Sequence, residues 1–335
     1  MLTDPFGRTV DYLRISVTDR CDLRCTYCLP KGFKGFAVPK DWLTLEETAR
    51  ISAAFARLGT KRFRLTGGEP LLRKGLADLA AEINRQPGVE DISLTTNGTQ
   101  LGRYARTLRQ AGVRRLNISL DSLRGDCVKS ITGTDCLPQV LEGIKTAKQA
   151  GFERIKINMV PLKGVNDTDL DDMAAFCIEN GFILNLIEAM PMGATGQAHA
   201  KVNLQPVLAQ LQQKFNLKPF EGRIGGGPAR YWQSGSGDFI LGLITPMSRH
   251  FCATCNRVRL SATGNLHLCL GQENKVPLRP LLRGGCTDAE LEHVKYRAKL
   301  SQGNGELCSK IEPLSVCYKL LRFITQRSPT WMLCM

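Results

Sequence analysis

The sequence lacks the features that mark several large classes of protein. No stretch of its 335 residues approaches the ~18 consecutive apolar residues that a membrane-spanning helix requires. Residues 1–8 contain no apolar run of the kind that directs a protein to secretion. Aromatic residues make up only 7% of the chain and do not alternate with basic residues, as they would in a surface that binds single-stranded nucleic acid. We therefore expect a cytoplasmic protein that binds neither a membrane nor a nucleic acid.

Acidic residues are also scarce relative to basic ones. Lys and Arg number 45 and Asp and Glu 31, which gives a formal net charge of +14. A surplus of this size suits a partner rich in phosphate, either a small polyphosphate or a polynucleotide, although solvated surface charge would give the same total. The remaining composition, 43% hydrophobic and 23% charged, is that of a globular protein with room for one large domain or two unequal ones.

Short β-branched runs alternate with helix-like segments between residues 11 and 190. Each run is followed by a polar or glycine-containing turn and an amphipathic stretch, the first of which opens with a capping box at Thr44 and Glu47. Strict β-α alternation predicts a parallel sheet covered by helices. Six units are too few for a closed eight-stranded barrel, which leaves an open partial barrel or a doubly wound sheet. The predicted strands are residues 12–17, 62–65, 91–95, 115–120, 154–160 and 182–187.

Polar and glycine-containing motifs follow these strands where they end. Residues 66–70 (TGGEP) follow the second strand, 95–98 (TTNG) the third and 119–122 (SLDS) the fourth. Ligands of parallel α/β folds bind at the carboxyl ends of the strands, so we expect the active site there. After residue 190 the alternation gives way to Gly, Pro and Gln, which predicts a first domain over 1–190 and a smaller one over 191–294.

Six of the thirteen cysteines fall into two tight groups, and the first group follows the first predicted strand. It consists of Cys21, Cys25 and Cys28. A reducing cytosol disfavours structural disulfides, so this clustering indicates metal or redox chemistry. Structural zinc and a [4Fe-4S] cluster each take four ligands, and only three are supplied here. A cluster held by three cysteines leaves one iron open to a small molecule, which indicates catalysis; zinc completed from elsewhere is the alternative.

The second group consists of Cys252, Cys255 and Cys269. Taken alone, this spacing favours zinc, with His250 or His267 as the fourth ligand. The surrounding sequence changes that interpretation, because it matches a known family.

The spacing CxxxCxxC, with Tyr27 before the last cysteine, resembles the motif of the radical S-adenosylmethionine enzymes. Residues 251–260 (FCATCNRVRL) and 264–269 (GNLHLC) closely resemble one subgroup, the GTP 3′,8-cyclases of molybdenum cofactor biosynthesis. The resemblance runs from about residue 11 to residue 294. It implies an α/β fold, a partial (β/α)6 barrel of TIM type with a smaller C-terminal iron–sulfur domain. It also implies two [4Fe-4S] clusters, S-adenosylmethionine as cofactor, GTP as substrate, an electron donor and a homodimer.

The resemblance also implies a reaction. In this family the open iron of the first cluster binds S-adenosylmethionine, whose cleavage yields methionine and a 5′-deoxyadenosyl radical. That radical would remove the hydrogen at ribose C3′ of GTP, and the new carbon radical would attack guanine C8. The product would be (8S)-3′,8-cyclo-7,8-dihydroguanosine 5′-triphosphate, on the route to molybdopterin.

Residue roles follow from matching positions. The ligands of the first cluster are expected to be Cys21, Cys25 and Cys28, and those of the second Cys252, Cys255 and Cys269. The first three cysteines, with Arg257 and Arg259, are the residues expected to be catalytic. The positions that match contacts to S-adenosylmethionine are Tyr27, Gly68, Ser119 and Met190. The positions that match contacts to GTP are Arg14, Arg64, Thr95, Lys156, Arg257, Val258 and Arg259.

Several of these assignments have independent physical support. The pair Gly67–Gly68 would let the backbone approach a ligand closely, although a simple turn would also use it. Arg257 and Arg259, two apart in an extended segment, would project from one face toward phosphate. Charged residues that alternate with apolar ones inside predicted strands, as Arg14, Arg64 and Lys156 do, would face a ligand if they point inward.

Two features depart from the family pattern. Asn185 occupies the position of a usual arginine, and losing one charged phosphate contact costs ~1.5–3 kcal/mol, or about tenfold or more in affinity. Residues 295–335 lack the usual glycine-rich tail ending in Gly-Gly, and a frameshifted or replaced terminus would have this character. We expect this tail to be poorly packed and cyclase activity to be reduced or lost.

Three other functions remain open at this level. A peptide-modifying radical S-adenosylmethionine enzyme with an auxiliary cluster is disfavoured by Arg257 and Arg259, because a peptide needs no phosphate clamp. A nucleic-acid-binding module with structural zinc would contain zinc and no iron. A catalytically impaired homologue that still binds its ligand is the third.

The metal content distinguishes these classes. After anaerobic reconstitution we expect about eight irons per chain, because each cysteine group would hold four. Addition of GTP, S-adenosylmethionine and a reductant should then release 5′-deoxyadenosine, measured by chromatography. Zinc in place of iron, with no iron–sulfur absorbance, would instead support the nucleic-acid-binding module.

Overall fold

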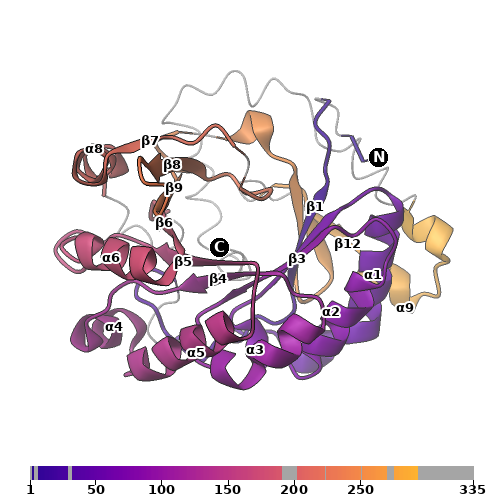
Figure 1. Ribbon diagram of the computed structural model, residues 1–335. Coiled ribbons are helices and arrows are strands. Elements are labelled where there is room, and N and C mark those ends of the chain that lie inside the picture. Colours follow the sequence, from indigo (N-terminus) through magenta and orange to yellow (C-terminus); the bar gives the residue numbers. More distant parts are fainter. Residues whose placement is uncertain are drawn as a thin grey trace.

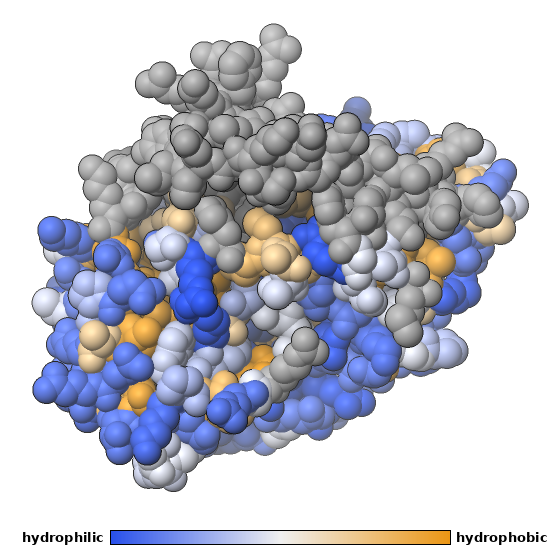
Figure 2. Space-filling view, turned by 90° about the horizontal axis from the view of Figure 1, so that it is seen from above, coloured by the Kyte–Doolittle hydropathy of each residue, from blue (hydrophilic) through white to orange (hydrophobic). Residues whose placement is uncertain are grey.

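The computed structural model describes residues 2–3, 7–28, 32–190, 202–222, 224–249, 251–269 and 275–292. The expected poorly packed tail, 295–335, lies outside these residues. None of the described helices is long and apolar enough to cross a bilayer. On the face shown in Figure 2, hydrophobic side chains occur in small groups among hydrophilic ones.

The first half of the chain forms the predicted parallel strands. Neighbours in the sheet follow chain order, and each strand begins and ends within one residue of its prediction. The partial barrel predicted from the sequence is confirmed. The strands are β1 (Tyr12–Ser16), β2 (Arg62–Thr66), β3 (Asp91–Thr96), β4 (Arg115–Ser119), β5 (Arg154–Met159) and β6 (Ile183–Ile187).

Helices cover the outer side of this curved sheet (Figure 1). The helix α1 begins with the predicted capping box, in which Thr44 Oγ1 accepts from Glu47 N at 3.0 Å and Glu47 Oε2 accepts from Thr44 N at 2.8 Å. Leu13 and Ile15 of β1 are fully buried in the core, and the alternate residues of the strand face the barrel interior. The helices are α1 (Leu45–Arg57), α2 (Leu76–Asn84), α3 (Leu101–Gln110), α4 (Gly125–Thr132), α5 (Leu137–Gln149) and α6 (Leu170–Asn180).

The second half of the chain extends the same sheet at both edges. Within the described residues β9 pairs in parallel with β6, and β10 pairs in parallel with β1, giving the order β12-β11-β10-β1-β2-β3-β4-β5-β6-β9-β8-β7. The expected extended segment that holds Arg257 and Arg259 is β10, whereas the sequence did not predict the other strands, and the domain division at residue 190 stays a prediction. The elements are α8 (Leu204–Phe215), β7 (Leu217–Pro219), β8 (Arg230–Ser234), β9 (Ile240–Ile244), β10 (Arg257–Leu260), β11 (Asn265–His267), β12 (Lys275–Pro277) and α9 (Arg279–Arg283).

The turn after β2 packs directly on the turn after β1. Gly68 N donates to Thr18 O at 2.9 Å, and Glu69 N donates to Arg20 O at 2.8 Å. A Cβ atom on Gly68 would overlap the Arg20 carbonyl, and one on Gly67 would crowd Thr18 O. The close approach that these glycines permit is therefore to the backbone leading into the first cysteine group.

Replacing Gly68 should loosen this junction. In Gly68→Ala the new methyl group meets backbone that cannot move aside cheaply, so we expect a loss of about 1–3 kcal/mol in unfolding free energy. Gly125→Ala is the matched control, because its Cβ would meet open space at the start of α4. Thermal unfolding of both variants measures the difference, and equal melting temperatures would contradict the packing described above.

Candidate active site

The loop that carries the first cysteine group is held on one side by the end of α4 and on the other by residues that follow β3. Arg24 N donates to Thr132 O and Thr26 N to Ile131 O, both at 2.9 Å, which fixes the loop to the end of α4. On the other side Asp22 accepts from Asn97 Nδ2 at 2.7 Å and from Thr99 Oγ1 at 2.6 Å. These hydrogen bonds attach the described part of the cysteine loop to α4 and to the residues after β3.

The three thiols of this loop are partly buried. Burial raises the pKa of Cys21 to about 12 and that of Cys28 to about 11, and it raises the pKa of Cys25 well above its usual range. A bound metal centre would have to displace these protons, as metal binding to thiols generally does. Within the described residues no three His, Cys, Asp or Glu side chains converge on one ion. Three thiolates that each bind a different iron need not converge, so the donor set fits a [4Fe-4S] cluster better than a single ion.

Tyr27 ties the cysteine loop to β4 and β5. Its hydroxyl donates to Asp121 Oδ2 at 2.7 Å, and Asp121 Oδ1 accepts from Val160 N at 2.8 Å. Tyr27 also lines a small hollow, which it shares with Met190, another predicted cofactor residue. Gly68 and Ser119 lie at the ends of β2 and β4, at the same edge of the sheet but outside the residues that line this hollow.

Two carboxylates at strand ends hold backbone rather than metal. Glu69 is fully buried and accepts from Leu71 N at 3.0 Å, Thr96 Oγ1 at 2.7 Å and Asn97 N at 2.7 Å, and burial raises its pKa to about 7. Glu188 Oε2 accepts from the backbone N–H groups of Met247 and Ser248, at 2.8 and 3.0 Å, in the turn that precedes the second cysteine group. Sequence reasoning gave no role to Glu69, Asp121 or Glu188, although each lies in a strand-end motif.

The predicted GTP-binding residues share the interior face of the barrel. Arg14 on β1 pairs with Arg64 on β2 and with Arg259 on β10. Thr95 on β3 pairs with Asn117 on β4, which in turn pairs with Lys156 on β5. Paired residues of adjacent strands point to the same side of a sheet. The ring of Tyr12 lies 5.5 Å from Arg64 Cζ and 5.9 Å from Arg257 Cζ, which places both guanidinium groups on that side. Val258 faces the other way, into the hydrophobic core.

The interior carries more positive than negative charge. Arg62 pairs with Asp11, and Arg115 with Asp91, near the starts of the strands. Within the described residues Arg64, Lys156 and Arg257 have no carboxylate partner. Thr95 Oγ1 and Arg257 Nε are buried without a hydrogen-bond partner. Such a cavity wall suits a ligand with several negative charges.

Lys156 is the most strongly perturbed of these cations. Its Nζ donates to the Tyr231 hydroxyl and to Ile224 O, the latter at 3.4 Å. Burial, together with the positive charges of Arg64, Arg115 and Arg154, lowers the pKa of Lys156 to about 6. Tyr231 lies on β8 and was not predicted from the sequence, because its partner is 75 residues away.

Asn185 is also on the interior face. Its amide donates to Asn158 Oδ1 at 2.9 Å. Its own Oδ1 lies against Gly242 of β9, where a Cβ atom would overlap it. The neutral side chain of Asn185 therefore lies between Asn158 of β5 and Gly242 of β9.

The second cysteine group lies at the other end of β1 from the first. Cys255 is two residues before β10, which starts level with the start of β1, whereas Cys21 follows the end of β1. Arg259 pairs with His267 of β11, two residues before Cys269. Cys252 and Cys269 are exposed and Cys255 is half-buried. The cationic interior face thus lies between the two cysteine groups.

Comparison with known proteins identifies the family of the chain. Residues 15–177 match the Radical SAM superfamily, and residues 182–302 match Molybdenum Cofactor Synthesis C. The GTP 3′,8-cyclase 2 of Pseudomonas aeruginosa is 46% identical over 293 residues, which cover 86% of this chain and 88% of that protein. The GTP 3′,8-cyclase of Paracoccus denitrificans is 45% identical over 295 residues, covering 87% and 85%.

A solved structure shows the same fold. SuiB of Streptococcus suis bound to S-adenosylmethionine superposes with a TM-score of 0.60 and 16% identity, covering 96% of this chain and 76% of that one. At that identity the likeness concerns the fold alone. Together with the cysteine motifs and the close relatives, it shows that the chain belongs to the GTP 3′,8-cyclase family of radical S-adenosylmethionine enzymes.

Proposed function

We propose that this protein cyclises GTP to (8S)-3′,8-cyclo-7,8-dihydroguanosine 5′-triphosphate in molybdenum cofactor biosynthesis, using S-adenosylmethionine. The observation that carries the proposal is the buried cationic face between two groups of three cysteines. The names of the relatives, all GTP 3′,8-cyclases, agree with it. We further propose that it acts in the cytoplasm as a homodimer and receives its electron from a separate donor.

The first cysteine group would hold the cluster that works with S-adenosylmethionine. When bound, that cluster supplies the electron that cleaves the cofactor to methionine and a 5′-deoxyadenosyl radical. Hydrogen bonds within the chain hold this loop in place: Asp121 accepts from Tyr27, and Asp22 accepts from Asn97 and Thr99. Tyr27, Gly68, Ser119 and Met190 would contact the cofactor, and the hollow beside Tyr27 and Met190 supports this for those two.

The second group, Cys252, Cys255 and Cys269, would hold a second [4Fe-4S] cluster whose open iron receives guanine. Its place beside β10 supports this, because Arg257 and Arg259 of β10 project into the interior next to it. These two arginines, with Arg14, Arg64, Thr95 and Lys156, would bind the rest of the nucleotide. The side chain of Val258 is in the core, so a contact from this residue would come from its backbone.

The buried cations count against a peptide as substrate. A peptide has no triphosphate to compensate the half-buried Arg64 and Arg257 or the buried Lys156, and charge held away from water without a partner is costly. Asn185 supplies one charge fewer than the family pattern, which would weaken triphosphate binding without removing the other contacts.

Turnover of the reconstituted enzyme tests the proposal. With GTP, S-adenosylmethionine and dithionite, mass spectrometry should detect the cyclised nucleotide together with 5′-deoxyadenosine. Arg257→Ala should lower kcat/KM about tenfold or more, because a hydrogen bond to a charged group contributes ~1.5–3 kcal/mol. Arg106→Ala, on the exposed side of α3, should leave turnover unchanged. Release of 5′-deoxyadenosine with GTP left intact would refute the proposed reaction.

The pH dependence of GTP binding tests the role of Lys156. In the empty barrel its pKa of about 6 leaves the amine largely neutral at pH 8. A bound triphosphate favours the ammonium form, so binding takes up a proton and affinity falls as pH rises above 6, by up to about tenfold per unit.

Calorimetry in two buffers of different ionisation enthalpy measures this proton uptake. Lys156→Arg is the matched control, because arginine stays charged at every pH. Protonation of GTP itself contributes equally to the proton uptake of both proteins and cancels in the comparison. We expect the unaltered protein to take up on the order of one proton more than this variant at pH 8. Identical proton uptake by the two proteins would show that Lys156 does not gain a proton when GTP binds.

A further inference from the structure

One large side chain of the barrel interior ends in a polar group that no described residue contacts. Tyr12 of β1 is 1% exposed, and its hydroxyl has no hydrogen-bond partner among the described residues. A buried hydroxyl without a partner costs free energy, whereas phenylalanine would fill nearly the same volume without that cost. We therefore expect the hydroxyl to meet a group outside the described chain, and its surroundings indicate which.

The surroundings of Tyr12 are cationic. β1 lies between β2 and β10 in the sheet, and Tyr12 is in register with Arg62 on one side and with Arg257 on the other. The Tyr12 ring lies 5.5 Å from Arg64 Cζ and 5.9 Å from Arg257 Cζ. Arg62 is balanced by Asp11, whereas Arg64 and Arg257 form no ion pair with a described carboxylate. Any group that reaches the Tyr12 hydroxyl therefore lies close to two guanidinium groups.

The Tyr12 ring also helps to place these guanidinium groups. The face of an aromatic ring attracts a guanidinium, so one ring near two strands can hold two like-charged side chains close together. Arg257 Cζ lies 5.7 Å from the Phe251 ring as well, and Arg64 Nε donates to Ser93 Oγ at 3.2 Å. Arg257 Nε, like the Tyr12 hydroxyl, is buried without a hydrogen-bond partner among the described residues. Two donors near one another are thus left for a ligand.

The chemistry of these groups favours a phosphate oxygen. A tyrosine hydroxyl can donate or accept a hydrogen bond, but a guanidinium group can only donate. Phosphate oxygens carry negative charge and accept several hydrogen bonds at once, so one phosphate can satisfy Tyr12 together with an arginine. A guanine base also has acceptor atoms, but it is neutral and would leave both guanidinium groups uncompensated.

We propose that Tyr12 is a phosphate-binding residue, whose hydroxyl donates to a phosphate oxygen of the nucleotide and whose ring positions Arg64 and Arg257 for the same triphosphate. This inference rests on the proposed function and adds a contact that the sequence did not predict. The hydroxyl gains a partner only when the nucleotide is bound. Tyr12 therefore stabilises the complex while it destabilises the empty protein.

The variant Tyr12→Phe tests both halves of this statement, because it removes the hydroxyl and keeps the ring. In the reconstituted holoenzyme without nucleotide, the melting temperature should rise by about 2 °C or more, since a buried hydroxyl without a partner is removed. Calorimetry should show inorganic triphosphate binding about tenfold more weakly, because a hydrogen bond to a charged group is lost. A tyrosine with a merely structural role would not change stability and affinity in opposite directions.

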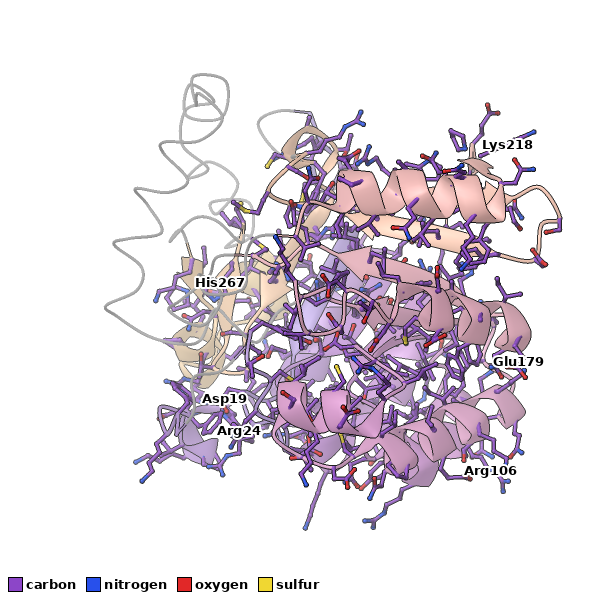
Figure 3. All side chains as sticks on the ribbon, turned by 90° about the vertical axis from the view of Figure 1, so that its left-hand side faces the viewer. Asp19, Arg24, Arg106, Glu179, Lys218 and His267 are labelled. Atoms are coloured by element: carbon purple, nitrogen blue, oxygen red, sulfur yellow. The ribbon has the colours of Figure 1, made fainter. Side chains whose placement is uncertain are left out.

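Tyr104→Phe is the matched control. Tyr104 is half-buried on α3, and its ring lies 5.3 Å from Arg103 Cζ, the same kind of aromatic–guanidinium contact outside the barrel. Figure 3 shows Arg106 of this helix on the other side of the molecule from His267 of β11, the strand that pairs with β10. This variant should keep the melting temperature and the triphosphate affinity of the unaltered protein.

Two further measurements separate the base from the phosphate and the ring from the hydroxyl. Guanosine has no phosphate, so the unaltered protein and Tyr12→Phe should bind it equally. Tyr12→Leu removes the ring as well as the hydroxyl. It should bind triphosphate more weakly than Tyr12→Phe does, because Arg64 and Arg257 lose the contact that positions them. Equal affinities of these two variants would refute the positioning role of the ring.

Four results would overturn the phosphate contact: unchanged triphosphate affinity in Tyr12→Phe, a lower melting temperature in that variant, an equal loss of affinity in Tyr104→Phe, or a loss confined to guanosine. None of these measurements depends on turnover, so the two proposals fail separately. Release of 5′-deoxyadenosine with GTP left intact would refute the proposed cyclisation, whereas the role of Tyr12 is judged by triphosphate affinity and thermal stability.

Discussion

Cationic side chains line the interior of this barrel, whereas packed hydrophobic side chains fill the interior of many small barrels. Alternation along each strand directs Leu and Ile outward, under the helices, and directs Arg14, Arg64 and Lys156 inward. Two of the interior arginines are balanced, by Asp11 and Asp91. Burial, together with the positive charges of Arg64, Arg115 and Arg154, lowers the pKa of Lys156. An anionic ligand beside Lys156 offsets these positive charges and favours its protonated form.

The cysteine loop is also held in place by many hydrogen bonds at the carboxyl ends of the strands. Glu69, Asp121 and Glu188 each use a carboxylate to hold backbone N–H groups or neighbouring hydroxyls. Gly67 and Gly68 complete the arrangement by letting two turns pair at backbone distance. These residues fix the loops from which Cys21, Tyr27 and the second cysteine group extend.

The sequence is sufficient for some of these features and not for others. Strand positions are predictable to within one residue, because β-branched alternation is a local property of the chain. The common face of the predicted GTP-binding residues follows from the same alternation once the strands are in register. The placement of β9 beside β6 and of β10 beside β1 is not predictable in this way, since no local pattern encodes which edge a late strand joins. For the same reason no sequence signal identifies Tyr231, whose partner Lys156 is distant in the chain, or the hydrogen bond by which Asp121 anchors Tyr27.

The pairing of β1 with β10 affects how the molecule is made. β1 is synthesised first, yet one of its edges acquires a partner only when the ribosome has added the residues around Asn256, 245 positions after Asp11. At translation speeds of about 5–20 residues per second, that edge of the nascent chain stays uncovered for tens of seconds. An unpaired edge of this kind can pair with other strands, so it is a potential site of aggregation until β10 is added. Completion of the barrel is thus a late event in biosynthesis.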